Sequence, residues 1–346
     1  MQLTSTEINI STRTNLQWLI KSHLVFRRES VPLQDVPSKD YLVRVDVCGL
    51  CRTDLHFATS WAHTWEHLGH EFGGTIVSAR RTDGPFKAGE RVAVKNASAC
   101  LVCEDCKHGR YRTCTGLIAN RDGFSQYSAC DERSLVLAEG LDDDLLSLVE
   151  PTNVALDLLH SAAIEPNHHV LILGTGTLSF LAAHLAVQHF GSQSVTVAGR
   201  RSERDPVIDF GVAAYSSFDQ LRKSKWDRVL VTTPPRTLPV ALEACAPGGR
   251  ILTVGLAEED ALHAAVDMRT LIFKRATIQG VFSVPNLYFN EAVGVLRRCG
   301  ESLRQIIGRR IAAGNLESWF REWNERKSFD GKTVINFRDE ECSPSH

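Results

Sequence analysis

The stretch that decides the fold is Leu171-Ile-Leu-Gly174-Thr-Gly176-Thr-Leu-Ser179. An apolar run typical of a buried strand leads into two glycines, and the pattern that follows is helical. In this context Gly174 allows a tight turn, and Gly176 lets the backbone approach a pyrophosphate held at the helix N-terminus. Ser179 replaces the third glycine of the fingerprint and is small enough for close helix-strand packing. The stretch therefore predicts a dinucleotide site, which Thr177 and Leu178 complete.

Strand-like and helical segments alternate around and beyond this loop. Alternation of this length indicates the α/β class, with a doubly wound parallel sheet of the Rossmann type. A helix is predicted over 177–189, and buried strands are predicted at residues 169–174, 194–198, 228–231, 249–254 and 276–280. After Gly280 we expect a helix over 290–299 and a terminal strand over 332–337.

The end of the second predicted strand of this region indicates which dinucleotide is bound. Gly199-Arg200-Arg201 offers two adjacent guanidinium groups, and no Asp or Glu stands where a ribose 2′-hydroxyl would be accepted. Guanidinium suits a 2′-phosphate in charge and in fork geometry. The sequence therefore predicts a preference for NADP(H) over NAD(H). The alternative is a solvated turn with surface arginines.

The residues before the glycine loop have a different sequence pattern. Short strand-like runs at 41–47, 73–78, 90–94 and 134–137 are separated by turn residues such as Asp83-Gly84-Pro85. β-Branched residues recur in them with a period near two, which is typical of antiparallel strands. An antiparallel β region therefore precedes the α/β region.

Four cysteines within this β region have the spacing of a metal site. Zn²⁺ prefers a tetrahedral set of ligands, and two-residue gaps let a short loop wrap one ion. The alternative is four unrelated buried thiols. Because four thiolates leave no open position, this zinc would be structural and would do no chemistry. The four ligands are Cys100, Cys103, Cys106 and Cys114, and the lobe that they define spans residues 96–116.

A second group of ligand-type residues leaves a position open. Cys51, His70 and Glu150 supply a thiol, an imidazole and a carboxylate. A catalytic zinc has three protein ligands of these types and a fourth position for water or substrate. Glu71 is available as a supporting group or as an exchangeable ligand. Each of these residues alone is most often a packed or solvated side chain. Together, and upstream of a dinucleotide fold, they predict a catalytic metal site.

These motifs, in this order, resemble the zinc-dependent medium-chain alcohol and polyol dehydrogenase family, in its sorbitol, glucose and threonine dehydrogenase-like branch. The resemblance covers the chain from about Tyr41 to Phe337. It rests on Gly49-Leu-Cys51-Arg-Thr53-Asp54, Gly69-His70-Glu71, the four-cysteine lobe, Asp122-Gly-Phe-Ser-Gln-Tyr127, Glu150-Pro151 and the glycine loop.

The resemblance implies a split architecture. A GroES-like, mainly antiparallel catalytic domain would comprise residues 1–152 and 283–346, and a Rossmann dinucleotide-binding domain would comprise 153–282. Two zinc ions per chain are implied, one catalytic and one structural. Homodimers or homotetramers are usual in the family.

The resemblance also implies residue roles. Cys51 and His70 match the ligands of the catalytic zinc, Glu150 matches the third-ligand carboxylate of the polyol branch, and Glu71 matches the carboxylate that exchanges onto the metal. Which of the two carboxylates is the resting ligand stays open. The hydroxyl of Thr53 corresponds to the group that accepts the substrate proton, His56 to its relay partner, and Asp54 to the group that orients a ligand.

The chain departs from the family pattern in two places. No Pro precedes Gly69-His70, and the segment 61–67 is short and aromatic; His63 and His67 in it are expected to be pocket-wall or surface residues. Thr233-Pro234-Pro235 stands where the family usually has a small residue and Gly. The first departure concerns the substrate pocket, and the second concerns the rim of the coenzyme site.

Three functions are compatible with these motifs. The leading one is hydride transfer between NADP(H) and a secondary hydroxyl or ketone of a sugar, polyol or cyclitol, including a biosynthetic intermediate. The second is oxidation of simple primary or aromatic alcohols, which Trp61 and Trp65 would favour if they line the pocket. The third is a non-catalytic dinucleotide-binding protein. The complete ligand set and Thr53 argue against it, because such a protein has no need of an open zinc site.

Composition excludes other classes of protein. The 346 residues are 43% hydrophobic and 23% charged, as in soluble globular proteins, and suffice for about two domains. A net charge of −2 leaves no basic surplus for nucleic acid. Gly174, Gly176, Ser179 and His184 interrupt the most apolar stretch, so no membrane segment is expected. Without a signal-peptide pattern, and with clustered cysteines, a cytoplasmic enzyme acting on a small molecule is expected.

Overall fold

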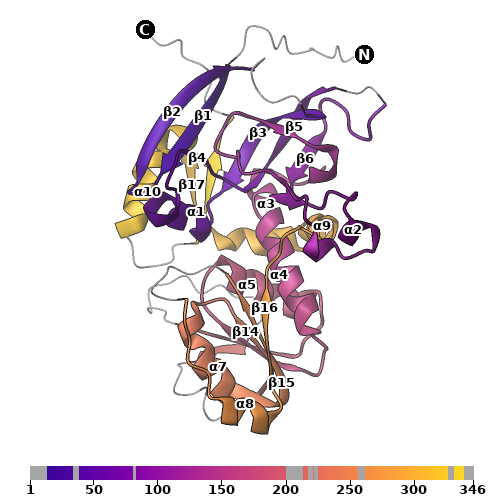
Figure 1. Ribbon diagram of the computed structural model, residues 1–346, viewed down its shortest axis with the longest axis vertical. Coiled ribbons are helices and arrows are strands. Elements are labelled where there is room, and N and C mark those ends of the chain that lie inside the picture. Colours follow the sequence, from indigo (N-terminus) through magenta and orange to yellow (C-terminus); the bar gives the residue numbers. More distant parts are fainter. Residues whose placement is uncertain are drawn as a thin grey trace.

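The computed structural model describes residues 14–33, 39–80, 83–199, 213–216, 221, 225–255, 262–325 and 331–338. It has two regions, which lie one above the other in Figure 1. The upper region holds the N-terminal strands together with the C-terminal helix and strands, and the lower region holds the segments coloured from pink to orange. Segments from both ends of the chain therefore build one region.

The lower region contains a six-stranded sheet in the order β13-β12-β11-β14-β15-β16, in which every pairing is parallel. The sequence order reverses at β11, so the loop after this strand lies at the switch point where such sheets bind dinucleotides. The predicted doubly wound sheet is confirmed. Its elements are β11 (His169–Leu173), α5 (Thr177–Gln188), β12 (Ser194–Ala198), β13 (Ala213–Ser216), β14 (Trp226–Val231), α7 (Leu238–Ala244), β15 (Cys245–Val254), α8 (Met268–Lys274) and β16 (Thr277–Val281).

The upper region contains a seven-stranded sheet in the order β10-β6-β5-β3-β18-β17, with β9 also pairing with β3. All its pairings are antiparallel except that of β17 with β18, which confirms a mainly antiparallel region. The strands are β3 (Tyr41–Gly49), β5 (Glu71–Ala79), β6 (Arg91–Val94), β9 (Tyr127–Cys130), β10 (Leu135–Leu137), β17 (Ile307–Ala312) and β18 (Lys332–Asn336).

The hydrogen bonds between β18 and β3 join the end of the chain to its first half, with Ile335 opposite Cys48. This pairing accounts for a catalytic region that is discontinuous in sequence. The domain boundaries at 152/153 and 282/283 stay a prediction.

A hairpin near the N-terminus was not expected from the sequence. Strand β1 (Thr14–Lys21) pairs with β2 (Val25–Pro32) and with the short β4 (Glu66–His67). All β2 side chains are exposed or half-buried. Because no face of this strand is fully buried, its sequence lacks the alternation of apolar and polar residues that would predict a strand. The lobe between residues 96 and 116 begins at another small sheet, formed by β7 (Ala97–Ser98) and β8 (Ile118–Ala119).

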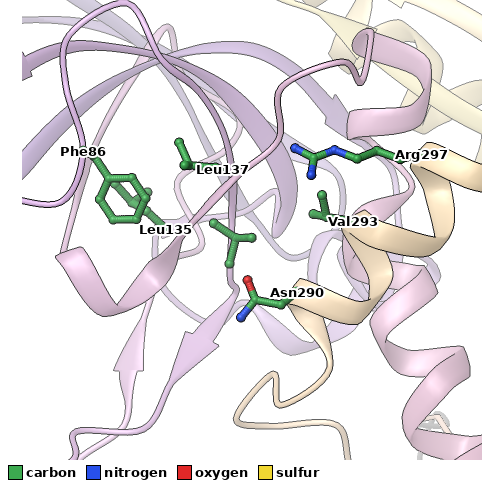
Figure 2. Close-up of a pocket in the computed structure, with 7 residues that line it drawn as sticks. Phe86, Leu135, Leu137, Asn290, Val293 and Arg297 are labelled. Atoms are coloured by element: carbon green, nitrogen blue, oxygen red, sulfur yellow. The ribbon is translucent and has the colours of Figure 1, made fainter.

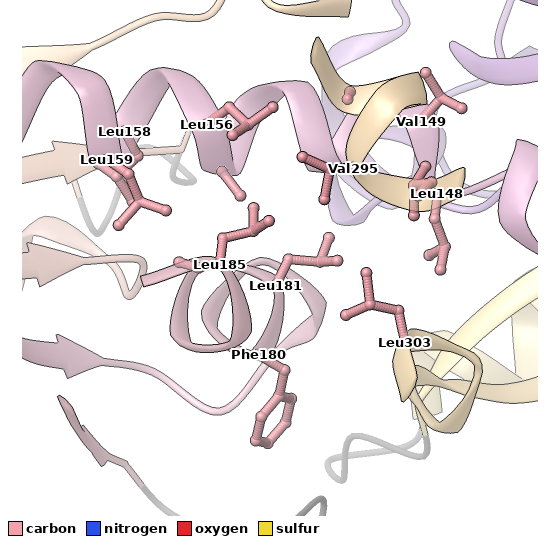
Figure 3. Packing of buried hydrophobic residues seen from close by; sticks show 14 of the residues in the cluster. Leu148, Val149, Leu156, Leu158, Leu159, Phe180, Leu181, Leu185, Val295 and Leu303 are labelled. Atoms are coloured by element: carbon pink, nitrogen blue, oxygen red, sulfur yellow. The ribbon is translucent and has the colours of Figure 1, made fainter. Parts of the chain in front are cut away.

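Two long helices connect the regions. One buried apolar cluster includes Val47 of the antiparallel sheet, Leu252 of the parallel sheet, and residues of α4 (Val149–Ala162) and α9 (Phe289–Leu303). Figure 3 shows α4 lying across α5, with Leu181 and Leu185 of α5 directed toward it. Because so many of its side chains are buried, α4 holds the residues of its first turn in a fixed position.

Shorter helices complete the described chain. They are α1 (Arg52–His56), which continues into a π-helical turn (Phe57–Trp61), α2 (Glu104–Lys107), α3 (Asp143–Leu146), α10 (Leu316–Glu325) and single 3₁₀ turns at Tyr111–Thr113, Glu132–Ser134, Pro235–Thr237, Arg304–Ile306 and Ala313–Asn315. In these parts of the chain, no helix has both the length and the apolar character that crossing a membrane requires.

Candidate active site and metal centres

Three ligand-type side chains meet at the inner end of the antiparallel sheet. The ligand atoms of Cys51, His70 and Glu71 all lie within 4.8 Å of one another. Cys51 directly precedes α1, His70 ends the loop before β5, and Glu71 is the first residue of β5. We call these three residues the open cluster. A thiol, an imidazole and a carboxylate are the donor types of a catalytic zinc, and three of them leave a fourth position for water or substrate.

Asp54 ties the two loops of the open cluster together. Its Oδ1 accepts a hydrogen bond from His70 Nδ1 at 3.1 Å, and its Oδ2 accepts one from the Cys51 N–H at 3.0 Å. A carboxylate only accepts, so Nδ1 carries the proton and Nε2 is the nitrogen able to bind a metal. Burial by itself lowers the pKa of His70, but the charges of Asp54 and Cys51 outweigh it and raise this pKa well above its usual value.

The backbone before His70 requires glycine. Gly69 has φ +87°, and a Cβ at this position would lie 2.5 Å from the ring of Phe124. Phe124 is fully buried, and its N–H donates to the carbonyl of Leu68 at 3.0 Å. Gly69 and the Asp122–Tyr127 segment therefore pack as one unit behind the imidazole.

Lys332 is a residue of the site that the sequence analysis did not single out. It opens β18, is buried, donates to the carbonyl of Leu50 at 2.9 Å and forms an ion pair with Glu71. Burial lowers the pKa of Lys332, but the charges of Glu71 and Cys51 raise it above its ordinary value overall. A lysine at the start of the predicted terminal strand was the available clue, because a buried lysine needs an acidic partner.

Glu150 lies beside the open cluster but is not part of it. It stands in the first turn of α4, is buried, and accepts a hydrogen bond from Asn96 Nδ2 at 3.1 Å. Burial raises the pKa of Glu150 to about 7, although the charge of His70 lowers it. Two carboxylates therefore flank one potential metal position, and Glu71 is the nearer to Cys51 and His70.

Thr53 and His56 both lie on α1, directly after Cys51. Thr53 is half-buried, and His56 is buried with its ring stacked on Trp61 at 5.1 Å between centroids. His63 and His67 are exposed and belong to neither metal-ligand group. Trp65 is partly exposed, and the guanidinium of Arg27 lies over its ring at 4.5 Å.

The four predicted lobe cysteines come together as one group. Their sulfurs all lie within 4.8 Å of one another, with separations of 3.5 Å (Cys100–Cys114), 3.9 Å (Cys103–Cys114) and 4.0 Å (Cys100–Cys106). Four sulfurs about 2.3 Å from a central zinc would stand about 3.8 Å apart. The donor set and its spacing therefore fit a closed zinc site, which we call the four-cysteine lobe.

Backbone N–H groups prepare two of these thiols, Cys103 and Cys100, for a metal. Hydrogen bonds from the backbone of Cys106 and Thr115 lower the pKa of Cys103 to about 6, and those of Val102 and Cys103 lower the pKa of Cys100. Thiolates are the form that binds zinc. The lobe is anchored to α4 by Arg112, whose Nη1 and Nη2 donate to the buried Asp157 carboxylate at 2.9 and 2.6 Å.

The glycine loop has the geometry that a dinucleotide site needs. Gly174 has φ +136°, and a Cβ there would lie 2.2 Å from Thr232 Oγ1. Gly176 is the N-cap of α5, so Thr177 and Leu178 lie in its first turn. Ser179 makes a hydrogen bond of 2.7 Å with Thr232, which gives the replacement of the third glycine a structural role.

Of the residues expected near the ribose, only Gly199 is described. It follows β12, and a Cβ on it would lie 2.8 Å from Thr175 of the glycine loop. Close packing of the second strand end against the loop therefore needs glycine. Arg200 and Arg201 lie outside the described residues.

A pocket of about 330 Å³ lies away from these groups, where Phe86 and β10 face α9 (Figure 2). Its lining is mostly apolar, with two polar side chains from α9. It includes none of the predicted site residues: the lining consists of Phe86, Leu135, Val136, Leu137, Asn290, Val293 and Arg297.

Comparison with known proteins agrees with this geometry. The alcohol dehydrogenase GroES-like domain family matches residues 37–140, and the zinc-binding dehydrogenase family matches residues 178–298. The first match contains the open cluster and the four-cysteine lobe, and the second begins in the helix after the glycine loop. The chain belongs to the zinc-dependent medium-chain alcohol and polyol dehydrogenases. It is an oxidoreductase of this family, as its motifs predicted.

Relatives of this dehydrogenase include proteins named as dehydrogenases of L-galactonate and of sorbitol. L-Galactonate-5-dehydrogenase of Escherichia coli is 29% identical over 194 residues, which are 53% of this chain and 55% of that protein. Sorbitol dehydrogenase of Bacillus subtilis is 26% identical over 286 residues, 75% of this chain and 80% of that protein.

The fold is also that of solved dehydrogenase structures. One is a zinc-binding dehydrogenase of Sinorhizobium meliloti bound to NADP, with a TM-score of 0.83 and 20% identity over 94% of this chain and all of that one (100%). The similarity shows that the arrangement of the two regions is shared.

Proposed function

We propose that this dehydrogenase transfers hydride between NADP(H) and a secondary alcohol or ketone of a sugar, polyol or cyclitol-type substrate. The observation that carries the proposal is the meeting of Cys51, His70 and Glu71 within 4.8 Å, with a second buried carboxylate, Glu150, beside them. This arrangement supplies more ligands than an open zinc site needs, so one carboxylate is free to exchange.

Different residues of the chain would bind the metal ion and transfer the substrate proton. Cys51 and His70 hold the ion, together with Glu150 or Glu71, and Asp54 fixes the imidazole through Nδ1 at 3.1 Å. When bound, the zinc supplies a Lewis acid that lowers the pKa of the substrate hydroxyl. Thr53 accepts the hydroxyl proton and His56 relays it toward solvent, since both follow Cys51 on α1.

The coenzyme is proposed to bind across the glycine loop, with its pyrophosphate at the N-terminus of α5. Gly176 leaves room for it, since a Cβ there would meet nothing within 4 Å, and Thr177 and Leu178 follow in the first turn of α5. Gly174 and Gly199 let the loop and the end of β12 pack closely beside this position. The preference for NADP(H) rests on the two guanidinium groups of Arg200 and Arg201 in the sequence.

A polyol or sugar-type substrate is supported by the names of two relatives, L-galactonate-5-dehydrogenase and sorbitol dehydrogenase, whereas other relatives are named L-threonine 3-dehydrogenases. A second function, oxidation of a simple or aromatic alcohol, is favoured by Trp61, whose ring stacks on His56 close to the proposed proton path. A non-catalytic dinucleotide-binding protein is the least supported, because nothing in that role would require an open cluster.

Further parts of the proposal concern the whole protein. The enzyme would bind two zinc ions per chain, one in the open cluster and one in the four-cysteine lobe, whose sulfur separations suit it. It would divide into a catalytic domain (1–152 and 283–346) and a coenzyme domain (153–282). We also propose a cytoplasmic homodimer or homotetramer, with no nucleic-acid or membrane partner.

The test follows the absorbance of reduced nicotinamide across polyols, sugars, cyclitols and simple or aromatic alcohols, with NADP and NAD in parallel. We expect turnover of polyols with NADP that a chelator abolishes, and about two zinc ions per chain. Activity confined to aromatic alcohols would favour the second function. Silence across the panel with about one zinc ion per chain would favour the non-catalytic protein.

The coenzyme preference has its own test. The double substitution Arg200→Ala and Arg201→Ala should weaken NADP binding by about tenfold or more, through loss of charge-assisted hydrogen bonds, and should leave NAD binding nearly unchanged. Fluorescence titration measures both affinities. An equal effect on the two coenzymes would refute the 2′-phosphate assignment.

A further inference from the structure

Asn96 is the hydrogen-bonding partner of the buried carboxylate beside the open cluster. It follows β6, and its Nδ2 donates to Oε1 of Glu150 at 3.1 Å. Within the described ranges this is the only hydrogen bond that the Glu150 carboxylate makes. One oxygen of Glu150 is therefore held by protein, and the other is not.

The second polar atom of the Asn96 side chain is unusual. Its Oδ1 is buried and has no hydrogen-bond partner among the described residues. A buried acceptor without a donor costs about 1–3 kcal/mol, so such an atom calls for an explanation. Glu150 lies beside the open cluster, so a water molecule or a hydroxyl group entering the site would be able to supply this donor.

The two carboxylates at the site are held in chemically different ways. The ammonium of Lys332 forms an ion pair with Glu71, whereas the hydrogen-bond partner of Glu150 is the neutral amide of Asn96. A neutral donor fixes the orientation of a carboxylate without reducing its attraction for a cation. Glu71 is nearer to Cys51 and His70 but is paired with an ammonium, whereas Glu150 has no ion-pair partner among the described residues.

We propose that Asn96 is a positioning residue for Glu150. Its N–H holds Oε1 so that Oε2 is presented to the metal or to the water bound there, and its Oδ1 accepts a hydrogen bond from a water or a substrate hydroxyl. This inference rests on the proposed function, because it takes Glu150 as part of the zinc site.

The experiment compares Asn96→Asp, which keeps the shape and replaces the amide donor with a carboxylate, with Asn96→Ala, which removes the group altogether. Asn120→Ala is the matched control, since buried Asn120 bonds the carbonyl of the neighbouring Lys95 at 2.9 Å and does not contact Glu150. The readouts are zinc per chain, the rate of zinc release to a colorimetric chelator, kcat and KM, and the coenzyme affinity.

Both Asn96 variants should release one of the two zinc ions faster and lose kcat, each by about 10–100-fold, the usual cost of removing a group that orients a ligand. Their coenzyme affinity should match that of the parent, because the glycine loop is untouched. Asn120→Ala should release zinc at the parental rate, even where it lowers the melting temperature.

The Glu150→Gln variant distinguishes a failure of the positioning role of Asn96 from a failure of the proposed role of Glu150. If Glu150→Gln speeds zinc release but both Asn96 variants behave like the parent, the positioning role is refuted and the proposed function stands. If Glu150→Gln itself keeps parental zinc release and turnover, the assignment of Glu150 fails. An Asn96→Ala variant that merely melts earlier, with parental zinc release in Asn96→Asp, also refutes the positioning role.

Discussion

The four-cysteine lobe and the open cluster are both built from ligand-type side chains, but they are assembled over very different lengths of chain. The lobe takes its four thiols from residues 100–114, and the spacing of the cysteines is enough to bring them together. The open cluster joins Cys51 to His70 and Glu71, and depends further on Glu150 from α4 and Lys332 from β18. One site is a local loop; the other exists only in the folded protein.

The two sites also differ in what surrounds the ligands. In the lobe, backbone N–H groups bond the sulfurs, for example Cys103 N–H to Cys100 Sγ at 3.3 Å. Around the open cluster the partners are side chains: Asp54 for His70, Lys332 for Glu71 and Asn96 for Glu150. Backbone donors suit a permanent structural ion, whereas individual side-chain partners allow a ligand set that changes during a reaction.

The largest effect is expected from Cys51→Ala. Loss of a ligand of the open cluster should reduce turnover by about 10³-fold or more, because catalysis through the ion requires its full set of protein ligands. Zinc content should fall from about two ions per chain to about one, with the lobe still loaded. Reduced-nicotinamide absorbance measures turnover, and fluorescence titration should show nearly unchanged coenzyme binding.

Cys48→Ala provides the control for this prediction. Cys48 is a fully buried thiol three residues away, and it belongs to neither metal group. Its replacement should retain two zinc ions and most of the turnover. Normal turnover in Cys51→Ala would contradict the assignment of the open cluster.

Cys103→Ser should produce the opposite pattern, a large loss of stability with a smaller loss of chemistry. The lobe would release its ion, and binding of a structural zinc contributes directly to folding, so several kcal/mol of stability should be lost. Turnover per folded molecule should fall much less than in Cys51→Ala. Zinc content, thermal melting and initial rates measured on the same preparation separate the two effects.

Cys299→Ser is the matched substitution outside the lobe. Cys299 is a half-buried free thiol on α9. It should change neither zinc content nor melting temperature appreciably. If Cys103→Ser instead kept its stability and lost turnover completely, the division into a structural and a catalytic site would be wrong.

The difference between the sites explains what sequence could predict. The lobe and the glycine loop are contiguous motifs, so the group of four thiols and the left-handed Gly174 followed from spacing and context. The parallel sheet followed from alternating buried strands, which are nearly continuous apolar runs. Lys332 and Asn96 were missed because their partners, Glu71 and Glu150, are 261 and 54 residues away and only the fold brings them close.

The hairpin β1–β2 was missed for another reason. Strand β2 lies at the edge of a three-stranded sheet, so little of it is buried and its sequence Val25-Phe-Arg-Arg-Glu-Ser-Val-Pro32 shows no apolar face. An edge strand of this kind is specified by its pairing partner rather than by its own pattern.

Arg112→Met tests the contact that joins the lobe to α4. It would leave the fully buried Asp157 carboxylate without its guanidinium partner, at a cost of about 3 kcal/mol of stability. Arg110→Met is the control, because Arg110 pairs with Asp105 at the surface of the lobe and exposed pairs of this kind contribute little to stability. Denaturant unfolding measures both. Equal effects would show that the lobe is not anchored through Asp157.

The smallest effect concerns a histidine far from either metal site. His184 lies in α5, is buried, and its Nε2 is 3.4 Å from Ser302 Oγ of α9. Burial lowers the pKa of His184 in the folded protein. The folded state therefore binds fewer protons than the unfolded state, so the stability is complete above the unfolded pKa of about 6.5 and is lost as the pH falls through it.

His184→Gln should remove this contribution to the pH dependence. Between about pH 7.5 and about pH 5.5 the parent should lose more melting temperature than the variant, because only the parent must keep an imidazole neutral against protonation. His63→Gln, at an exposed position, should retain the parental slope. Parallel slopes for His184→Gln and the parent would refute this contribution of the buried imidazole to the pH dependence.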